Sequence, residues 1–187
     1  MQAGPSLQPT LWRTCRVIAN HARLKMFGLL LQDPGLTVAA IARHLRRPLS
    51  MTSEYLRAME ARGLLSARRT GRWVEYRPNP VTSRNFTSGL VVALRGAFQR
   101  EPEPVETIFR LATAFTHPRR IEIFRALQTE PRTVRQLQAV TRIPGWALRR
   151  HLKKLETRGF VRRGGALYAV APCPSALGRE LARLAVG

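Results

Sequence analysis

Apolar residues recur at intervals of three and four through most of this chain, a spacing typical of amphipathic helices. The predicted helices cover residues 11–20, 22–31, 38–45, 51–62, 83–99, 105–116, 118–128, 133–141, 145–158 and 175–185. Apolar and polar residues instead alternate around glycine at 64–77 and 160–170, which predicts two β-hairpins. The pattern therefore favours a mainly α-helical protein with small β-hairpins, preceded by a disordered lead over residues 1–9.

Single residues bound several of these elements. Thr10 and Thr37 stand where a side chain would cap a helix, and Gly63 stands where a left-handed residue would end one. Trp73, in the first hairpin, is expected to lie in the core. Two further helices carry apolar stripes that predict packing surfaces: Phe86, Leu90, Leu94 and Phe98, and Leu177, Leu181 and Leu184.

One stretch of the sequence occurs twice. Residues 37–65 align without a gap with residues 133–161. The identical pairs are Thr37/Thr133, Val38/Val134, Arg46/Arg142, Pro48/Pro144, Leu56/Leu152, Glu60/Glu156, Arg62/Arg158 and Gly63/Gly159. The repeated unit is longer than the roughly 20–50 residues of stacked-repeat proteins, which indicates a duplicated domain. We therefore predict two domains, over residues 10–100 and 101–187. A core in a domain of roughly 80 residues is marginal alone, so the halves are expected to share an apolar interface with each other or with a second copy.

Charge points to a polyanionic partner. The chain has 32 Lys and Arg against 11 Asp and Glu, a formal net charge of +21, and the excess is present in both halves. Neutralising phosphates releases condensed counterions and provides most non-specific affinity for nucleic acid. A GC-rich genome would also enrich arginine in every protein that it encodes. The charge alone therefore does not distinguish nucleic-acid binding from this bias in composition.

Other composition features argue against several classes of protein. Cys15 and Cys173 have no paired spacing, so neither a disulfide framework nor a zinc site is predicted. No apolar run is long enough for a membrane helix, and residues 1–10 lack the layout of a signal peptide, so we expect a cytoplasmic protein. No cofactor is expected.

Two helices joined by a four-residue turn and followed by a hairpin form the pattern of a helix-turn-helix with a wing, and the pattern occurs in both halves. Residues 114–124 (AFTHPRRIEIF) and 141–161 (TRIPGWALRRHLKKLETRGFV) resemble the ArsR-type winged-helix transcription regulators. Residues 23–27 (RLKMF) and 55–64 (YLRAMEARGL) carry a looser resemblance in the first half. MarR-type regulators and the dimerisation modules of some methyltransferases have similar patterns. The resemblance implies two tandem winged helix-turn-helix domains that bind double-stranded DNA, with repression as the expected output.

In the resembled family, exposed residues of the second motif helix contact DNA. The corresponding positions here are Leu49, Ser50, Ser53, Glu54 and Arg57 in the first half, and Gly145, Trp146, Arg149, Arg150 and Lys153 in the second. An arginine can make a two-point contact with guanine, worth roughly 1–3 kcal/mol of discrimination. Glu54 either accepts from cytosine or indicates that the first helix binds differently, and Trp146 either stacks on the DNA or packs against the turn.

The wings and outer helices complete the expected interface. Arginines of the two hairpins are expected to contact phosphates or the minor groove, unless the hairpins are simply solvated. These are Arg68, Arg69 and Arg72, with Arg162 and Arg163 in the second wing. The family's outer helices form its dimer interface, which implies either a homodimer or an intramolecular pseudo-dimer with recognition helices ~34 Å apart.

Other functions have less support. The metal sensors of that family carry cysteines on the first motif helix. At those positions this chain has residues 38–41 (VAAI) and 134–137 (VRQL), which contain no cysteine. The four histidines of the chain are isolated in sequence, so no metal site is expected. Phosphate loops, nucleophile elbows and zinc-protease motifs are absent from the sequence, so we do not expect an enzyme. A protein-interaction adaptor is one alternative, although a net charge of +21 is unusual for a protein interface. An RNA-binding module is another, although an aromatic content of 7% is low for a protein that binds single-stranded RNA.

Overall fold

The computed structural model describes residues 10–71, 73–80 and 86–187, with the side chain of Phe86 left out. The first half holds α1 (Leu11–Ile18), α2 (His21–Gln32), β1 (Leu36–Thr37), α3 (Val38–His44), α4 (Leu49–Glu60), β2 (Leu65–Thr70), β3 (Trp73–Pro78) and α5 (Phe86–Arg100). The second holds α6 (Pro104–Ala112), α7 (Pro118–Ala126), β4 (Arg132–Thr133), α8 (Val134–Thr141), α9 (Gly145–Thr157), β5 (Val161–Gly164), β6 (Leu167–Val170) and α10 (Ala176–Val186). The predicted mainly helical class with small antiparallel hairpins is confirmed; the expected disordered lead lies outside the described residues.

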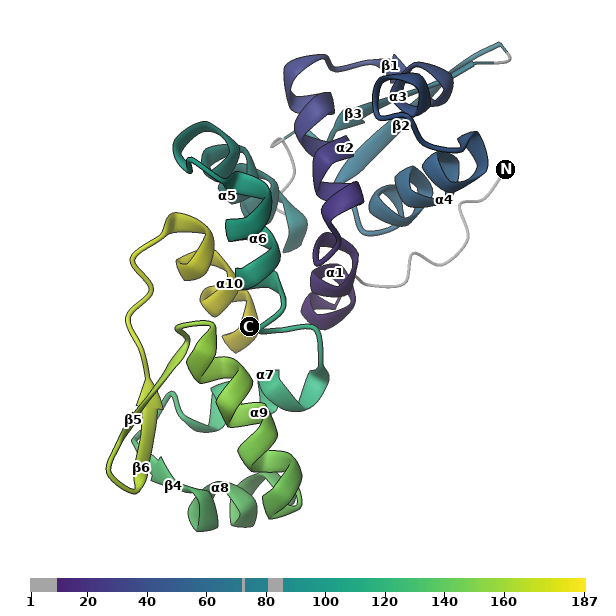
Figure 1. Cartoon of the computed structure of the whole chain (residues 1–187). Helices are drawn as coiled ribbons and strands as arrows, with labels where there is room; N and C mark the ends of the chain where they lie inside the picture. The colour runs from purple at the N-terminus through teal and green to yellow at the C-terminus, as the bar shows by residue number, and fades with distance from the viewer. Residues whose placement is uncertain (1–9, 72, 81–85) are drawn as a thin grey trace.

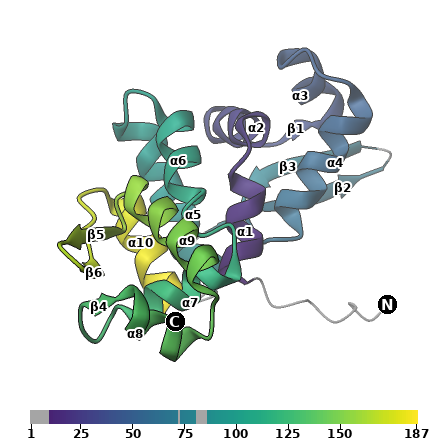
Figure 2. The ribbon, with the colours of Figure 1, turned by 60° about the horizontal axis from the view of Figure 1, so that its bottom comes forward.

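Each half contains a small antiparallel sheet with the same strand order. The orders are β1-β3-β2 and β4-β6-β5, so the strand that precedes the motif helices pairs with the second strand of the hairpin. Leu36 faces Tyr76 in the first sheet, and Arg132 faces Tyr168 in the second. The short strands β1 and β4 were not predicted, because two residues are too few to show alternation. Figures 1 and 2 show the two sheets on opposite sides of the molecule, with α5, α6 and α10 between them.

Matching residues of the repeat adopt matching backbone conformations. Arg46 and Arg142, each in the turn between the two motif helices, both have positive φ, at 50° and 54°. Gly63 also has the positive φ predicted for a helix stop, at 67°. Thr37 accepts a hydrogen bond from the amide of Ala40 and caps α3 as predicted. Thr10 occupies the capping position of α1 but its side chain makes no capping bond.

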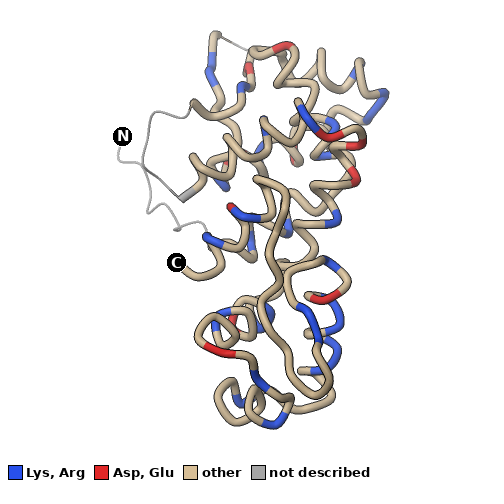
Figure 3. Tube along the Cα trace, turned by 90° about the vertical axis from the view of Figure 1, so that its left-hand side faces the viewer, with Lys and Arg blue, Asp and Glu red and all other residues tan. Residues whose placement is uncertain are grey.

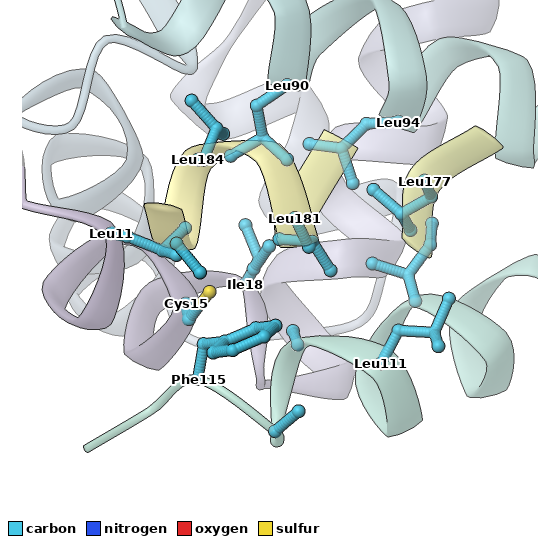
Figure 4. Close-up of a cluster of buried hydrophobic side chains, with 14 of the residues drawn as sticks. Leu11, Cys15, Ile18, Leu90, Leu94, Leu111, Phe115, Leu177, Leu181 and Leu184 are labelled. Atoms are coloured by element: carbon cyan, nitrogen blue, oxygen red, sulfur yellow. The ribbon is translucent and has the colours of Figure 1, made fainter. Parts of the chain in front are cut away.

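Both halves contribute to one apolar core. Figure 4 shows its centre, where α1, α5, α6 and α10 meet around Leu181. The labelled side chains, all buried, are Leu11, Cys15, Ile18, Leu90, Leu94, Leu111, Phe115, Leu177, Leu181 and Leu184. A polar contact between His21 Nε2 and Glu106 Oε1, at 2.8 Å, adds to the packing of α2 on α6. The halves therefore fold against each other rather than as separate cores.

The two predicted packing stripes lie in this core wherever their side chains are described. Leu177, Leu181 and Leu184 of α10 are buried, as are Leu90 and Leu94 of α5, while Phe98 is half-buried. The helix predicted from residue 83 is described only from Phe86, because residues 81–85 lie outside the described part.

The prediction that Trp73 lies in the core is wrong. It pairs with Thr70 next to the hairpin turn, beyond the cover of the helices, and is 49% exposed. Cys15 is buried in the core and Cys173 is half-buried, and both are free thiols. Among the described residues, no helix combines the length and the hydrophobicity needed to cross a bilayer.

Candidate nucleic-acid interface

The turn between α8 and α9 fixes the orientation of α9. Thr133 and Gln136 form reciprocal capping bonds at the start of α8, and Arg142 ends it in the left-handed conformation. Ile143, in the turn, is buried and anchors the start of α9. On the inner face of α9, Leu148 and Leu152 are also buried, so the opposite face is held outward. This is the arrangement in which a second motif helix lies in a major groove.

The outward face of α9 is strongly basic. Arg149, Arg150 and Lys153 are exposed, and their spacing places them on one side of the helix. Trp146 projects from the first turn of the helix and is 73% exposed, which rules out the alternative that it packs against the turn. Gly145, half-buried, leads into this face. The five residues predicted for the second half are therefore brought together on one surface.

The corresponding face of α4 has different chemistry. Ser50, Glu54 and Arg57 are exposed and Ser53 is half-buried, so this face offers one cation and one carboxylate. Arg57 donates from Nε to the carbonyl oxygen of Ser53, at 3.4 Å. Leu49 is also exposed. The two helices that the sequence repeat aligns, α4 and α9, therefore differ in the charge of their outer surfaces.

The two wings differ in length and in how freely their arginines project. Strands β2 and β3 have six residues each, and Arg68 and Arg69 are exposed on β2. Arg72 lies outside the described residues. In the shorter second wing, Arg162 and Arg163 are exposed. Arg163 is partly held, because its Nε donates to the carbonyl oxygen of Gly165 at 2.9 Å. Figure 3 shows Lys and Arg residues over both halves of the trace, with fewer Asp and Glu residues among them.

Two histidines that are distant in sequence stack beside α9. The rings of His117 and His151 lie 4.7 Å apart, centre to centre. His117 caps α7, where its Nδ1 accepts from the amide of Arg119 at 3.1 Å, and His151 is buried in α9. Sequence reasoning missed this pair, since each histidine is isolated along the chain. No cluster of three or more metal-ligating side chains occurs among the described residues.

Replacing His151 is expected to change how stability depends on pH. Burial, with a further contribution from His117, lowers the pKa of His151 to about 4, against 6.5 for an exposed histidine. Between these values the unfolded chain takes up a proton that the folded chain does not, so stability is full above about pH 6.5 and falls as the pH approaches 4. The loss is up to about 3 kcal/mol. Urea unfolding at about pH 7.5 and about pH 4.5 should therefore show a smaller pH effect in His151→Gln than in the wild type.

The control for this measurement is His44→Gln. His44 is exposed in the last turn of α3 and takes no part in the stack of His117 on His151, so this variant removes a histidine while leaving that pair intact. An unchanged pH effect in His151→Gln would contradict the assignment.

Comparison with known proteins identifies one part of this chain. Residues 115–163 match the sequence model of a family described as a helix-turn-helix domain. The match extends from Phe115, ahead of α7, to Arg163 in β5, and so includes α8, the turn and α9. No curated protein and no solved structure matches the chain significantly. The second half thus contains a helix-turn-helix domain, a unit typical of DNA-binding regulators.

Proposed function

We propose that this protein is a transcription regulator, of the ArsR type and acting as a repressor, that binds double-stranded DNA sequence-specifically. The observation that carries the proposal is the outward face of α9, where Arg149, Arg150 and Lys153 are exposed on the second helix of a helix-turn-helix. A net charge of +21 provides the non-specific attraction to the phosphate backbone. We propose a cytoplasmic binding protein without a catalytic step.

We further propose two winged helix-turn-helix units, over residues 10–100 and 101–187, that pair within one chain. The repeated strand order and the matching turn conformations of Arg46 and Arg142 support the duplication. The contact of α1 and α5 with α6 and α10 supports an intramolecular pair over a homodimer, because the outer helices already cover one another. Paired in this way, the two recognition helices would read sites about one DNA turn, ~34 Å, apart.

The proposed roles differ between the elements. Arg149 and Arg150 read base edges, with Trp146 against a sugar or a thymine methyl, while Lys153 contacts the backbone. The wing arginines Arg68 and Arg69 contact phosphates, as do Arg162 and Arg163 with less reach. Ser50, Ser53, Glu54 and Arg57 form a weaker second reading surface on α4.

One observation favours protein contact at the first half. Leu49 of α4 and Val38 of α3 line a shallow groove, together with Ala39, Ser53 and Arg57. An exposed leucine beside small residues suits an apolar partner as well as thymine methyl groups. An adaptor role for this half is therefore the second candidate.

Selection of duplexes from a random pool tests the proposed function. The full chain should enrich a defined sequence over successive rounds, because two-point arginine contacts discriminate between bases. An unrelated basic protein of similar charge is the control, since it retains duplexes without enriching any sequence. Retention without enrichment would contradict sequence-specific reading, and absence of binding at low salt would contradict DNA binding altogether.

A further inference from the structure

A cleft lies between the start of α7 and the flank of α9 that carries Ala147 and His151. Its volume is about 380 Å³, within the range of small-ligand sites. His117, Arg119 and Arg120 line it from α7 and the residue before it, while Arg150, His151 and Lys154 line it from α9. Trp146 stands at the same cleft. Only Arg150 and Trp146 belong to the DNA-binding set predicted from the sequence.

The charge of this cleft is uncompensated. Among the described residues that line it, none is acidic. None of its four cations, Arg119, Arg120, Arg150 and Lys154, forms an ion pair with a carboxylate of the described residues. Lys153, the neighbour of Lys154, provides a contrast, since its Nζ lies 3.7 Å from Oε2 of Glu156. Four cations without a counterion create a local potential that favours a multiply charged anion.

The inner part of the cleft holds unused hydrogen-bond donors. Arg120 donates from Nη2 to the hydroxyl of Thr116, but its Nε is buried without a partner. The Nδ1 atom of His117 accepts from the backbone, so in the neutral ring the proton is on Nε2. Burial, and then the charge of Arg150, lowers the pKa of Arg120. Burial, and then the charge of Arg158, lowers the pKa of Lys154. A bound anion would relieve the repulsion among these cations.

We propose that this cleft binds a nucleotide, with its phosphate held by Arg119, Arg120 and Lys154 and its base stacked on Trp146. Compact phosphate suits the site because Arg120 and Lys154 are half-buried in a concavity, which the convex backbone of a duplex enters less easily. The indole of Trp146 supplies a flat ring within reach of the same cleft.

The site overlaps the face that reads DNA, and this part of the inference rests on the proposed function. Trp146 cannot contact DNA while a nucleotide base is stacked on it, and Arg150 lines the same cleft. A bound nucleotide therefore competes with DNA for α9 and acts as an effector that releases it.

Two adjacent lysines provide a matched test. Lys154→Gln and Lys153→Gln remove one charge each from the same helix, but only Lys154 lines the cleft. Titration calorimetry of the full chain with adenosine monophosphate should show at least about tenfold weaker binding for Lys154→Gln, the loss of one charge-assisted contact, and less than about twofold for Lys153→Gln. Arg119→Gln, at an exposed position, should repeat the loss if Lys154→Gln disturbs folding, which circular dichroism would report.

Further measurements distinguish a nucleotide from other phosphate compounds and from the DNA backbone. Ribose 5-phosphate should bind more weakly than adenosine monophosphate, and Trp146→Ala should remove the difference. If neither compound binds, or if both lysine variants weaken binding equally, the proposal is overturned. If Lys154→Gln weakens duplex binding but not nucleotide binding, the cleft binds a phosphate of the DNA backbone. That result would also overturn the proposed nucleotide site. If the protein binds the nucleotide but does not bind any duplex, the nucleotide site is supported and the proposed DNA-binding function is wrong.

Discussion

Replacing Arg149 and Arg150 together by alanine is expected to reduce discrimination between the selected duplex and unrelated duplexes by about 30-fold to 10⁴-fold, since each two-point contact with guanine is worth about 1–3 kcal/mol. Both side chains are exposed on the face of α9 that the buried leucines hold outward. Affinity for unrelated duplexes should fall much less, because those complexes depend on the overall charge. Fluorescence anisotropy with the selected and a scrambled duplex, at several salt concentrations, measures both quantities.

The matched control for that variant is Arg68→Ala combined with Arg69→Ala. It removes the same charge from the first wing, where both side chains are exposed on β2. Binding should weaken alike for all duplexes, and the slope of log affinity against log salt should fall by about 2. If the two double variants behaved identically, the separation of base reading from phosphate contact would be wrong.

Leu181→Ala is expected to destabilise the whole chain by about 2–5 kcal/mol, the cost of removing a fully buried leucine. Leu181 is inaccessible to solvent and lies where α10 meets α5 and α6. Because the core is continuous, the loss should reach α4 in the first half as well as α9 in the second. Native-state hydrogen exchange, read for peptides of α4 and of α9, should show protection falling by the same factor in both.

The control for this variant is Leu167→Ala. Leu167 is 43% exposed in β6, so its truncation should change stability by about 0.5 kcal/mol or less. Loss of protection in α9 with no change in α4 would mean that the halves unfold independently.

Periodicity and residue chemistry were sufficient to predict most elements of the fold. The apolar stripe of α10 predicted its buried face, and the Thr37 cap and the Gly63 stop predicted the helix ends nearby. The two-residue strands β1 and β4 were beyond this method, because they pair with residues distant in sequence and carry no alternation of their own. Trp73 was misplaced for a related reason: β-propensity does not reveal how far a hairpin extends past the core.

The site was predictable only in part. The spacing of Arg149, Arg150 and Lys153 on one helix face follows from a 3.6-residue period, so sequence alone groups them. The cleft does not follow from any local pattern. It requires α7 to approach α9 closely enough for His117 to stack on His151. Phe115 contacts both Phe124 of α7 and Phe160, which follows α9, so aromatic residues distant in sequence pack together beside the two helices.

The unequal outer faces of α4 and α9, held in one chain, have a consequence for the DNA sequence itself. Identical subunits related by a dyad favour palindromic operators, because each subunit reads the same half-site. Here the outer face of α9 offers two arginines and a lysine, while that of α4 offers serines, one arginine and one carboxylate. If both helices read DNA as proposed, the preferred site should lack inverted symmetry, and the protein should bind that site in a single orientation.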